Sequence, residues 1–482
     1  MLKKLERIAI ISTRLGGIDG VSVEAEKWAK AYSMLGLEPL YIAGDTGVIS
    51  SNFFRIEEMD YYHPDIEKIR IEAFSKLKRN GIITLKDWIA RDDLGSKTEP
   101  CFPTPPGNWR ETDNGAEISD ETFDIPNLRK RIDNLKNIIK RKLLNAIAKN
   151  KVSYFSVENA LSIPLNIPLG IALTEIIVEE KIPTITRHHD FYWEREEFLD
   201  SAIEDILRDY FPPDLPNIKH VVINTLAQKS LFSRKGIKAT YIPNVFDFGI
   251  LNEKRENPSI VRGYLNVREK DYLFLQPTRI IRRKRIERSI ELVEKLSKIL
   301  NRNIFLFITG KPEKSEMDYF HDILAIADKK KVNLILSEGE GVGTNYSNSG
   351  YGRRNLKEGV FKRYNIFDLY NCCDLVTLPS DIEGFGNPVI EACAFRKPLF
   401  VNNYPVLRDM LSKGFDFVVI DGQVSSSCVE KVKKLLTEDN YREKVVERNF
   451  KIAHRFYSME FLIKELEKVL KGFICLESDH EA

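Results

Sequence analysis

The stretch from Asp374 to Phe400, DLVTLPSDIEGFGNPVIEACAFRKPLF, constrains the fold more than any other part of the chain. It begins with apolar residues typical of a buried strand, breaks at Pro379, and continues through two glycines into a predicted helix. We expect Asn387 to cap this helix and Pro388 to open its first turn. A strand, a glycine loop and a helix start predict an anion site, because the first N–H groups of a helix have no partner within it.

Two carboxylates flank the predicted helix start, Glu383 in the loop and Glu391 one turn inside the helix. Electrostatic repulsion would keep both carboxylates away from a phosphate, so we expect them to bind hydroxyl groups instead. The stretch therefore predicts a site for a phosphate that is attached to a sugar. The alternative is an ordinary solvated helix start, because surface helices are rich in glutamate.

The pattern Glu383-x7-Glu391 with EGFGNP between the acids resembles the signature of the retaining GT-B glycosyltransferases of family 4. The resemblance implies an α/β fold of the GT-B type, with two Rossmann-like doubly wound domains facing a central cleft and an insertion in the N-terminal domain. It also implies that Glu383 approaches the donor sugar and that Glu391 approaches the nucleotide ribose. The remaining donor-binding residues implied here are Gly384, Phe385, Gly386 and Asn387.

The length of 482 residues predicts two large domains. We expect residues 1–247 to form an acceptor-side domain with an insertion at about 46–150. Residues 248–450 should form the nucleotide-sugar-binding domain. Residues 451–482 should form a helix that crosses back to the first domain, followed by a tail.

The composition describes a soluble globular protein, with 43% hydrophobic residues and a formal net charge of +2. The six cysteines lack zinc spacing and are interpreted as reduced thiols. The apolar run near the N-terminus is too short for the hydrophobic region of a signal peptide. The sequence contains no run of about 18 apolar residues, so we expect no membrane-spanning helix. These features favour a cytoplasmic protein.

A predicted strand from Lys4 to Arg14 leads into Gly16-Gly17 and then a helix. Two adjacent glycines allow the backbone to approach a ligand closely, although a tight strand-to-helix turn needs them equally. The family has a Gly-Gly loop at this place, whose backbone faces the donor phosphate. The resemblance therefore adds Gly16 and Gly17 to the donor-binding residues.

The region of the expected insertion lacks the alternation of strands and helices. Asp92–Asp124 is rich in Pro, Gly and Thr and predicts an irregular excursion, with a role as a lid or in acceptor specificity. Ile125–Asn150 predicts a helix with one apolar face and eight Lys or Arg residues. Such a helix could contact an anionic membrane surface, but packing against its own domain is the favoured interpretation.

A predicted strand from Pro183 to His188 is followed by His189. Alternation along the strand sends the two histidines to opposite sides, so only one can face the cleft. The family carries a histidine at this strand end near the donor sugar, which makes His188 and His189 the catalytic candidates beside Glu383. His188 fits the Thr-x-His pattern and is the first choice, whereas His189-Asp190 fits an alternative His-Asp pattern. The residues expected on the acceptor side are Arg187, Asp190 and Trp193.

Five cations lie between Arg279 and Arg285, in a loop after another predicted strand. They could form a nucleic-acid-binding or localisation patch. The family interpretation uses only Arg279 and Lys284, which have the spacing of its Arg-x4-Lys diphosphate clamp. An arginine binds a phosphate through two N–H groups, and a lysine supplies a compact charge. Arg283 stands where the family commonly has an acid, so this loop is unusually positive.

The predicted reaction is the transfer of a hexose from a nucleotide diphosphate sugar to an acceptor hydroxyl, with retention as the resemblance implies. GDP-mannose and UDP-glucose are the first donors to test, and the acceptor is a sugar, a small molecule or a lipid-linked compound. The chain has no Asp-x-Asp and no cluster with metal spacing, so we expect no metal and no cofactor. The alternatives are a phosphorylase or sugar-nucleotide epimerase of the same fold, and a nucleic-acid-binding protein.

Overall fold

The computed structural model describes residues 6–16, 20–46, 52–74, 125–338, 342–346, 354–355 and 365–478. The chain divides into two compact units. The first unit combines Met1–Asn244 with Met459–Ala482, and the second is Val245–Ser458. The chain therefore leaves the first unit near Asn244 and returns to it at Met459.

The first unit is built on a seven-stranded sheet in the order β5-β3-β1-β6-β7-β8-β9, in which every neighbouring pair is parallel. The strands are β1 (Glu6–Ile11), β3 (Leu37–Ala43), β5 (Phe53–Arg55), β6 (Val152–Glu158), β7 (Thr184–His188), β8 (Ile218–Val222) and β9 (Ala239–Tyr241). The chain winds outward from β1 in one direction and from β6 in the other. Ligands of such sheets bind at the carboxyl ends of the strands where the direction changes.

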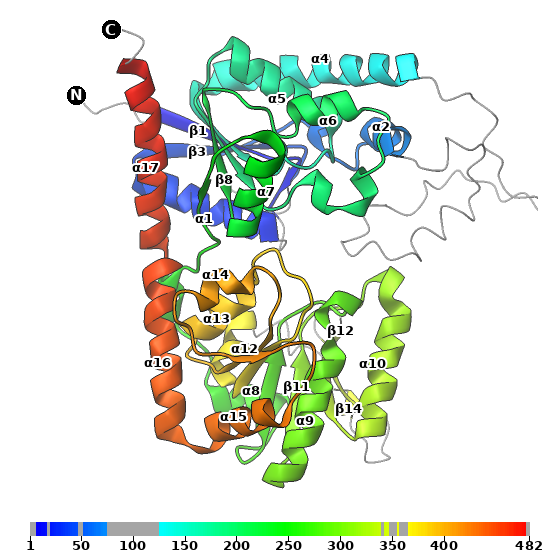
Figure 1. Ribbon diagram of the computed structural model, residues 1–482, viewed down its shortest axis with the longest axis vertical. Coiled ribbons are helices and arrows are strands. Elements are labelled where there is room, and N and C mark those ends of the chain that lie inside the picture. The colour runs from blue at the N-terminus through cyan, green and yellow to red at the C-terminus, as the bar shows by residue number, and fades with distance from the viewer. Residues whose placement is uncertain are drawn as a thin grey trace, which may run out of the picture. The chain divides into compact units, whose positions relative to one another are not determined.

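Helices connect these strands (Figure 1). Apolar side chains between the helices and the sheet form the core of the unit. The helices are α1 (Gly20–Met34), α2 (Pro64–Phe74), α4 (Ile125–Asn150), α5 (Ile167–Glu179), α6 (Glu204–Tyr210), α7 (Thr225–Lys235) and α17 (Met459–Ser478). The last helix, α17, packs against α1. The C-terminal segment is thus part of the first unit.

The helix predicted over Ile125–Asn150 is confirmed as α4, and its apolar face is buried as the periodicity indicates. The buried side chains are Leu128, Ile132, Leu135, Ile139, Leu143, Ala146 and Ile147. Lys136 and Lys140 form ion pairs with Glu175 of α5 at 2.9 and 2.8 Å. The helix thus packs on its own unit through both its apolar and its charged side chains.

Within the stretch expected as an insertion, the described residues belong to the unit itself. β5 extends the sheet through its pairing with β3, and α4 packs against α5. The irregular excursion expected at Asp92–Asp124 lies outside the described residues.

The second unit has an eight-stranded sheet in the order β14-β13-β12-β11-β10-β15-β16-β17. The strands are β10 (Tyr272–Gln276), β11 (Ile304–Ile308), β12 (Asn333–Glu338), β13 (Val342–Tyr346), β14 (Arg354–Asn355), β15 (Leu375–Leu378), β16 (Leu399–Asn402) and β17 (Val418–Ile420). β13 and β14 are antiparallel additions at one edge, whereas the other six strands are parallel. The winding direction changes between β10 and β15.

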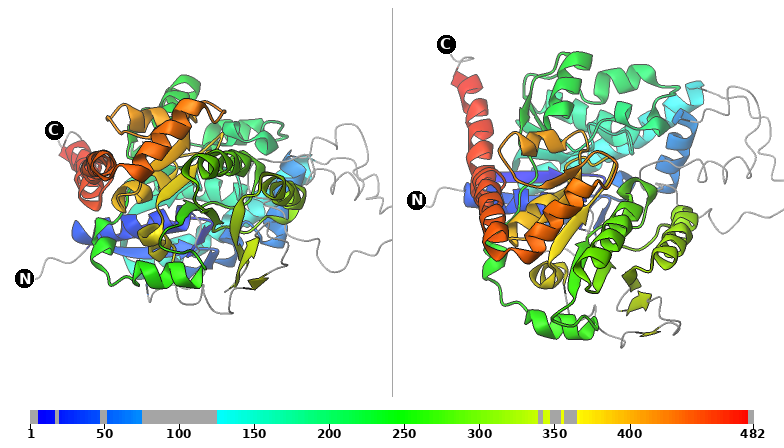
Figure 2. Two further views of the ribbon diagram at one scale, coloured as in Figure 1. Left: turned by 90° about the horizontal axis from the view of Figure 1, so that it is seen from below. Right: turned by 60° about the horizontal axis from the view of Figure 1, so that its bottom comes forward.

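The helices of the second unit flank this sheet (Figure 2). They are α8 (Pro258–Tyr264), α9 (Ile286–Leu300), α10 (Met317–Lys330), α12 (Ile366–Cys372), α13 (Asn387–Ala394), α14 (Leu407–Leu411), α15 (Ser426–Thr437) and α16 (Asp439–Phe456). Each sheet is therefore doubly wound, as the resemblance implied.

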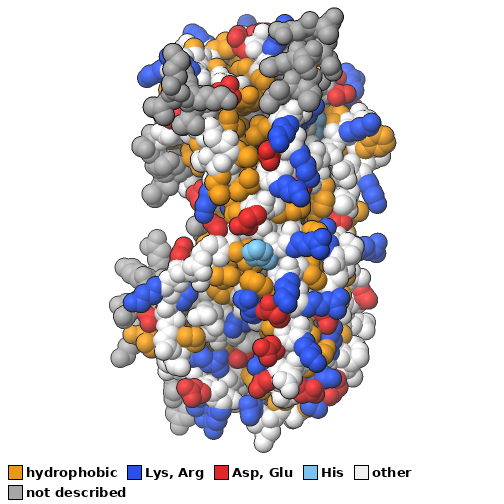
Figure 3. Space-filling view, turned by 90° about the vertical axis from the view of Figure 1, so that its left-hand side faces the viewer, with side chains coloured by type: hydrophobic (Ala, Val, Ile, Leu, Met, Phe, Trp, Pro, Cys, Tyr) orange, Lys and Arg blue, Asp and Glu red, His pale blue; other side chains and the backbone are white. Residues whose placement is uncertain are grey.

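Charges of both signs are interspersed on the surface of this unit. Figure 3 shows the face that includes α16, where Lys and Arg side chains lie among Asp and Glu side chains. Arg442 pairs with Asp439 at 2.7 Å, and Arg396 pairs with Glu447 at 2.9 Å. Among the described helices, none combines the length and the apolar character needed to cross a membrane.

The burial of the apolar face of α4 leads to a stability prediction. Ile139 is fully buried, so Ile139→Ala should lower the free energy of unfolding by about 2–5 kcal/mol through lost burial and a cavity. Lys130→Ala on the exposed face of the same helix is the control and should change it by less than about 0.5 kcal/mol. Urea denaturation measures both values. Equal effects of the two substitutions would contradict the packing described for α4.

Candidate functional site

A buried ion pair lies where the winding direction of the second sheet changes. The segment that follows β10 carries Lys284, and the segment that follows β15 carries Glu383. The Lys284 Nζ donates to both carboxylate oxygens of Glu383, at 2.6 and 2.9 Å. The side chains are only 11% and 9% exposed. Two residues selected from sequence patterns far apart in the chain are thus in direct contact.

The environment of this pair favours the ionised carboxylate. Burial alone would raise the pKa of Glu383, but the attraction of Lys284 and Arg283 lowers it below its ordinary value. Burial lowers the pKa of Lys284, and Glu383 partly offsets that effect. The carboxylate holds the ammonium group in place at the carboxyl ends of β10 and β15.

The basic loop from Arg279 to Arg285 is neutralised by carboxylates. Arg279 pairs with Glu313 at 2.6 Å, and Arg283 lies 3.4 Å from Glu383. Arg285 pairs with Asp381. The more exposed Arg282 lies 3.9 Å from Glu316 and 3.6 Å from Asp322. Each cation of the loop therefore has an acidic neighbour.

The position of Arg279 requires a glycine, Gly310, in the loop that follows β11. A Cβ atom at Gly310 would collide with the backbone of Thr278 and Arg279. Nearby, Ile280 and Pro312 form an isolated parallel bridge. The absence of a side chain at Gly310 therefore allows the loops after β10 and β11 to lie against each other.

The glycine loop before α13 differs from the prediction in one respect. The helix begins at Asn387, with Pro388 as its second residue, and Gly386 occupies the capping position with φ of 94°. The prediction that Asn387 caps the helix is therefore wrong. A Cβ atom at Gly386 would also collide with the hydroxyl of Tyr404, which donates a 3.0 Å hydrogen bond to the carbonyl of Phe385. The turn is thus fixed by a left-handed glycine and a buried tyrosine.

The residues around this turn differ in exposure. Phe385 and Gly386 are buried, whereas Gly384 is exposed. Glu391 lies one turn inside α13 and accepts a 2.6 Å hydrogen bond from the hydroxyl of Tyr370. Burial and the nearby Glu391 raise the pKa of Tyr370 well above its ordinary value, so this tyrosine stays protonated and donates. The buried Tyr370 therefore fixes the position of one carboxylate oxygen of Glu391.

In the first unit, the structure distinguishes the two histidine candidates. His188 is fully buried, and its Nε2 lies 3.0 Å from Nδ1 of His220 on β8. Burial lowers the pKa of His188 well below its ordinary value and that of His220 to about 3, so both rings are neutral. The preference for His188 is corrected here, because a ring enclosed in this way cannot contact a substrate. His189 is 12% exposed at the carboxyl end of β7.

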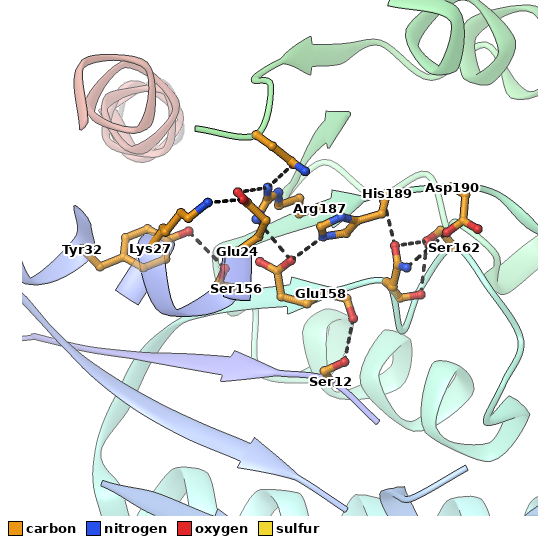
Figure 4. Close-up of polar contacts among 12 residues, drawn as sticks. Ser12, Glu24, Lys27, Tyr32, Ser156, Glu158, Ser162, Arg187, His189 and Asp190 are labelled. Carbon is orange, nitrogen blue, oxygen red and sulfur yellow. Dashed lines mark hydrogen bonds and ion pairs between the residues drawn. The ribbon is translucent and has the colours of Figure 1, made fainter. Parts of the chain in front are cut away.

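His189 is held by Glu158, the last residue of β6, and by Asn159, which follows it. Its ring Nε2 lies 3.1 Å from Oε2 of Glu158, and its backbone N–H donates to Oδ1 of Asn159 at 2.8 Å (Figure 4). Asn159 also donates to Asp190 at 3.2 Å. Asp190 in turn accepts a 2.6 Å hydrogen bond from Nε of Arg195. The carboxyl ends of β6 and β7 thus form one polar network.

Arg187 does not lie on an accessible surface. It is fully buried, stacks over the ring of Trp28 at 4.6 Å, and donates to Glu24 of α1 at 3.0 Å. It also donates to Asn244 at 2.7 Å. Arg187 was expected on the acceptor side, but its fully buried side chain contacts other groups of the same unit.

Trp193 stacks on Phe191 at 4.5 Å and donates from Nε1 to Ser230 at 2.9 Å.

Gly16 follows β2 (Arg14–Leu15) and adopts a φ of 91°, in which a glycine is favoured. Gly17 lies outside the described residues. In the described parts of the chain, no group of three or more His, Cys, Asp or Glu residues is arranged to hold a metal ion.

Sequence reasoning missed Glu24 and Glu158, which connect Arg187 and His189. Each is a single carboxylate without a motif around it. The available signal was the position of Glu158 directly after the run Val152–Val157, whose composition is typical of a strand, because functional residues gather at the carboxyl ends of parallel strands.

Comparison with known proteins adds a family to this geometry. Residues 359–452, which include the glycine loop and α13, match the family model described as "Glycosyl transferases group 1". Mannosylglucosylglycerate synthase of Thermotoga maritima is 30% identical over 95% of this chain and 97% of its own length. Mannosylglucosylglycerate synthase of Petrotoga mobilis is 31% identical over 85% of this chain and 86% of its own length.

Solved structures share the fold. A glycosyltransferase from Rickettsia africae matches with a TM-score of 0.60 and 14% identity, covering 98% of this chain and 99% of that one. Anabaena HepE, solved in complex with UDP and glucose, matches with a TM-score of 0.58 and 11% identity, covering 97% and 100%. The two doubly wound sheets therefore form a GT-B fold.

The similarity to the Thermotoga protein extends over nearly the whole of both chains, and the glycine loop that carries Glu383 and Glu391 lies inside the matched family model. The chain belongs to the group 1 glycosyl transferases and is a glycosyltransferase with the GT-B fold.

Proposed function

We propose that this enzyme transfers mannose from GDP-mannose to a hydroxyl group of glucosylglycerate, with retention of the anomeric configuration and without a metal ion. The names of the two relatives that are similar along most of the chain, both mannosylglucosylglycerate synthases, support the product. Retention is supported by the resemblance of Glu383-x7-Glu391 to the family 4 signature.

The observation that carries the proposal is the contact between Lys284 and Glu383 at the carboxyl ends of β10 and β15. An ammonium group has three N–H donors, so Lys284 can keep one bond to Glu383 and offer another to a diphosphate oxygen. Glu383 accepts hydrogen bonds only, which suits the hydroxyl groups of the donor sugar. In this proposal, Lys284 binds the diphosphate and the adjacent Glu383 binds hydroxyl groups of the sugar.

The charge that grows on the leaving diphosphate needs further donors. Arg279 lies in the same loop as Lys284, and the N–H groups at the start of α13 add the partial positive charge of a helix N-terminus. Preorganised donors of this kind usually contribute most to such a reaction. Glu391, anchored by Tyr370, would accept hydrogen bonds from the ribose hydroxyls.

In the proposed step, the bond between the sugar C1 and the diphosphate oxygen breaks while the acceptor oxygen bonds to C1 on the same face. The acceptor proton passes to the leaving phosphate oxygen. The products are GDP and the mannosylated acceptor. No protein base is required, and no metal ion enters the step.

Incubation with donor and acceptor pairs tests this function. GDP-mannose with glucosylglycerate should give a product one hexose heavier, with an α-linked mannose by NMR, and EDTA should leave the rate unchanged. UDP-glucose should give little product with the same acceptor. Transfer only from another nucleotide sugar, or a β-linked product, would contradict the proposal.

The acceptor needs its own comparison. A relative from Petrotoga mobilis named mannosylglucosyl-3-phosphoglycerate synthase is 24% identical over 69% of this chain. Glucosyl-3-phosphoglycerate should therefore be offered beside glucosylglycerate. The greater similarity to the synthases of the unphosphorylated product predicts a higher kcat/KM for glucosylglycerate, and the reverse order would assign the phosphorylated acceptor.

The role of Glu391 predicts a specific kinetic change. Glu391→Gln should raise the KM for GDP-mannose about 10-fold and change kcat little, because lost hydroxyl contacts weaken ground and transition states alike. A GDP-mannose analogue that lacks the ribose 2′- and 3′-hydroxyls should have the same raised KM with the wild-type enzyme. With Glu391→Gln, the analogue and GDP-mannose should have similar KM values. Glu443→Gln, at an exposed position of α16, is the matched control. If Glu391→Gln still preferred GDP-mannose over the analogue as strongly as the wild-type enzyme does, Glu391 would not be the residue that binds the ribose hydroxyls.

A further inference from the structure

Glu158, at the end of β6, is a buried carboxylate that the transfer step does not use. Its side chain is fully buried. Its Oε2 lies 3.1 Å from Nε2 of His189 and 3.7 Å from Nη1 of Arg187. Its Oε1 is buried and has no hydrogen-bond partner among the described residues. A carboxylate enclosed in this way needs compensating charge nearby.

The compensation comes from Arg187, which lies between two buried carboxylates. Its Nη2 donates to Glu24, and its Nη1 faces Glu158. Lys27 donates to the other oxygen of Glu24 at 2.5 Å. Positive and negative groups thus alternate from Lys27 to Glu158, and Figure 4 shows this row leading to the ring of His189. The arrangement supports an ionised Glu158.

An ionised carboxylate accepts hydrogen bonds and donates none. The ring nitrogen that faces Glu158 must therefore carry a hydrogen, which fixes Nε2 of His189 as a donor. In the neutral ring, Nδ1 is then an acceptor. No described residue has a hydrogen bond to Nδ1, so this nitrogen remains for a ligand.

His188 provides the contrast within the same strand end. Its ring faces His220 instead of a carboxylate, and it is fully enclosed. His189 is partly exposed, and its backbone is fixed by Asn159. Glu158 ends β6 and His189 follows the adjacent β7, at the edge of the sheet where ligands of doubly wound folds bind.

We propose that Glu158 is a positioning residue that holds His189 with its hydrogen on Nε2, so that Nδ1 accepts a hydrogen bond from a hydroxyl of a sugar substrate. The inference rests on the proposed sugar transfer for the identity of the ligand. The orientation of the ring follows from this unit alone. Buried partners of this kind fix the tautomer and the direction of a functional imidazole.

NMR of the enzyme labelled with ¹⁵N at histidine tests the tautomer without any substrate. The chain has seven histidines, and His189→Gln identifies the signals of His189. At a pH where the ring is neutral, the wild-type protein should show a protonated Nε2 and an unprotonated Nδ1. A protonated Nδ1 would overturn the proposal even if sugar transfer were demonstrated.

Glu158→Gln tests the consequence for catalysis. The amide can donate to Nε2, which allows the other tautomer, so kcat should fall about 10- to 100-fold while the KM for the donor changes less. The Nδ1 signal of His189 should shift toward the protonated form. Glu158→Asp keeps a carboxylate and should recover part of both the tautomer signal and the rate.

Glu24→Gln is the matched control, because Glu24 is equally buried and contacts Arg187 but not His189. It should leave the His189 tautomer unchanged. An equal change of the His189 signals in Glu24→Gln and Glu158→Gln would mean that the buried charges act only on the fold. If no sugar is transferred at all while the tautomer is as described, the proposed function fails and the positioning role remains.

Discussion

The ion pair between Lys284 and Glu383 is the interaction around which the candidate site of the second unit is arranged. Removing two charges from water is costly, and it is tolerated only where each charge has its partner in good geometry. Here the partners come from loops after β10 and β15, which are neighbours in the sheet. The parallel register, the close approach allowed by Gly310 and the left-handed turn at Gly386 all serve to bring these loops to defined positions.

The first unit uses a similar arrangement at its own change of winding direction. Arg187 is enclosed between Glu24 and Glu158, and the last carboxylate of this row meets His189. Both units therefore keep buried charges at the carboxyl ends of their central strands. Such groups contribute little net stability compared with apolar packing, which makes a role in ligand binding the better explanation for their presence.

Much of this arrangement could be predicted from the sequence where a repeating pattern carries the information. The apolar face of α4 follows the helical period, and the two motifs that carry Lys284 and Glu383 were recognised separately from their spacing, but the ion pair between these two residues was not predicted. The cap of α13 could not be predicted, because the turn depends on Tyr404, which reaches Phe385 from beyond the helix. The choice between His188 and His189 depended on His220 of the next strand, and strand alternation says nothing about that neighbour.

A double-mutant cycle on GDP-mannose binding tests the central claim most directly. Lys284→Met, Glu383→Gln and the double variant are compared with the wild-type enzyme by calorimetry. If both residues bind one donor as a unit, each single substitution should weaken binding at least about 10-fold, and the losses should be non-additive by about 1 kcal/mol or more. Binding of GDP-mannose with wild-type affinity by both single variants would contradict the account.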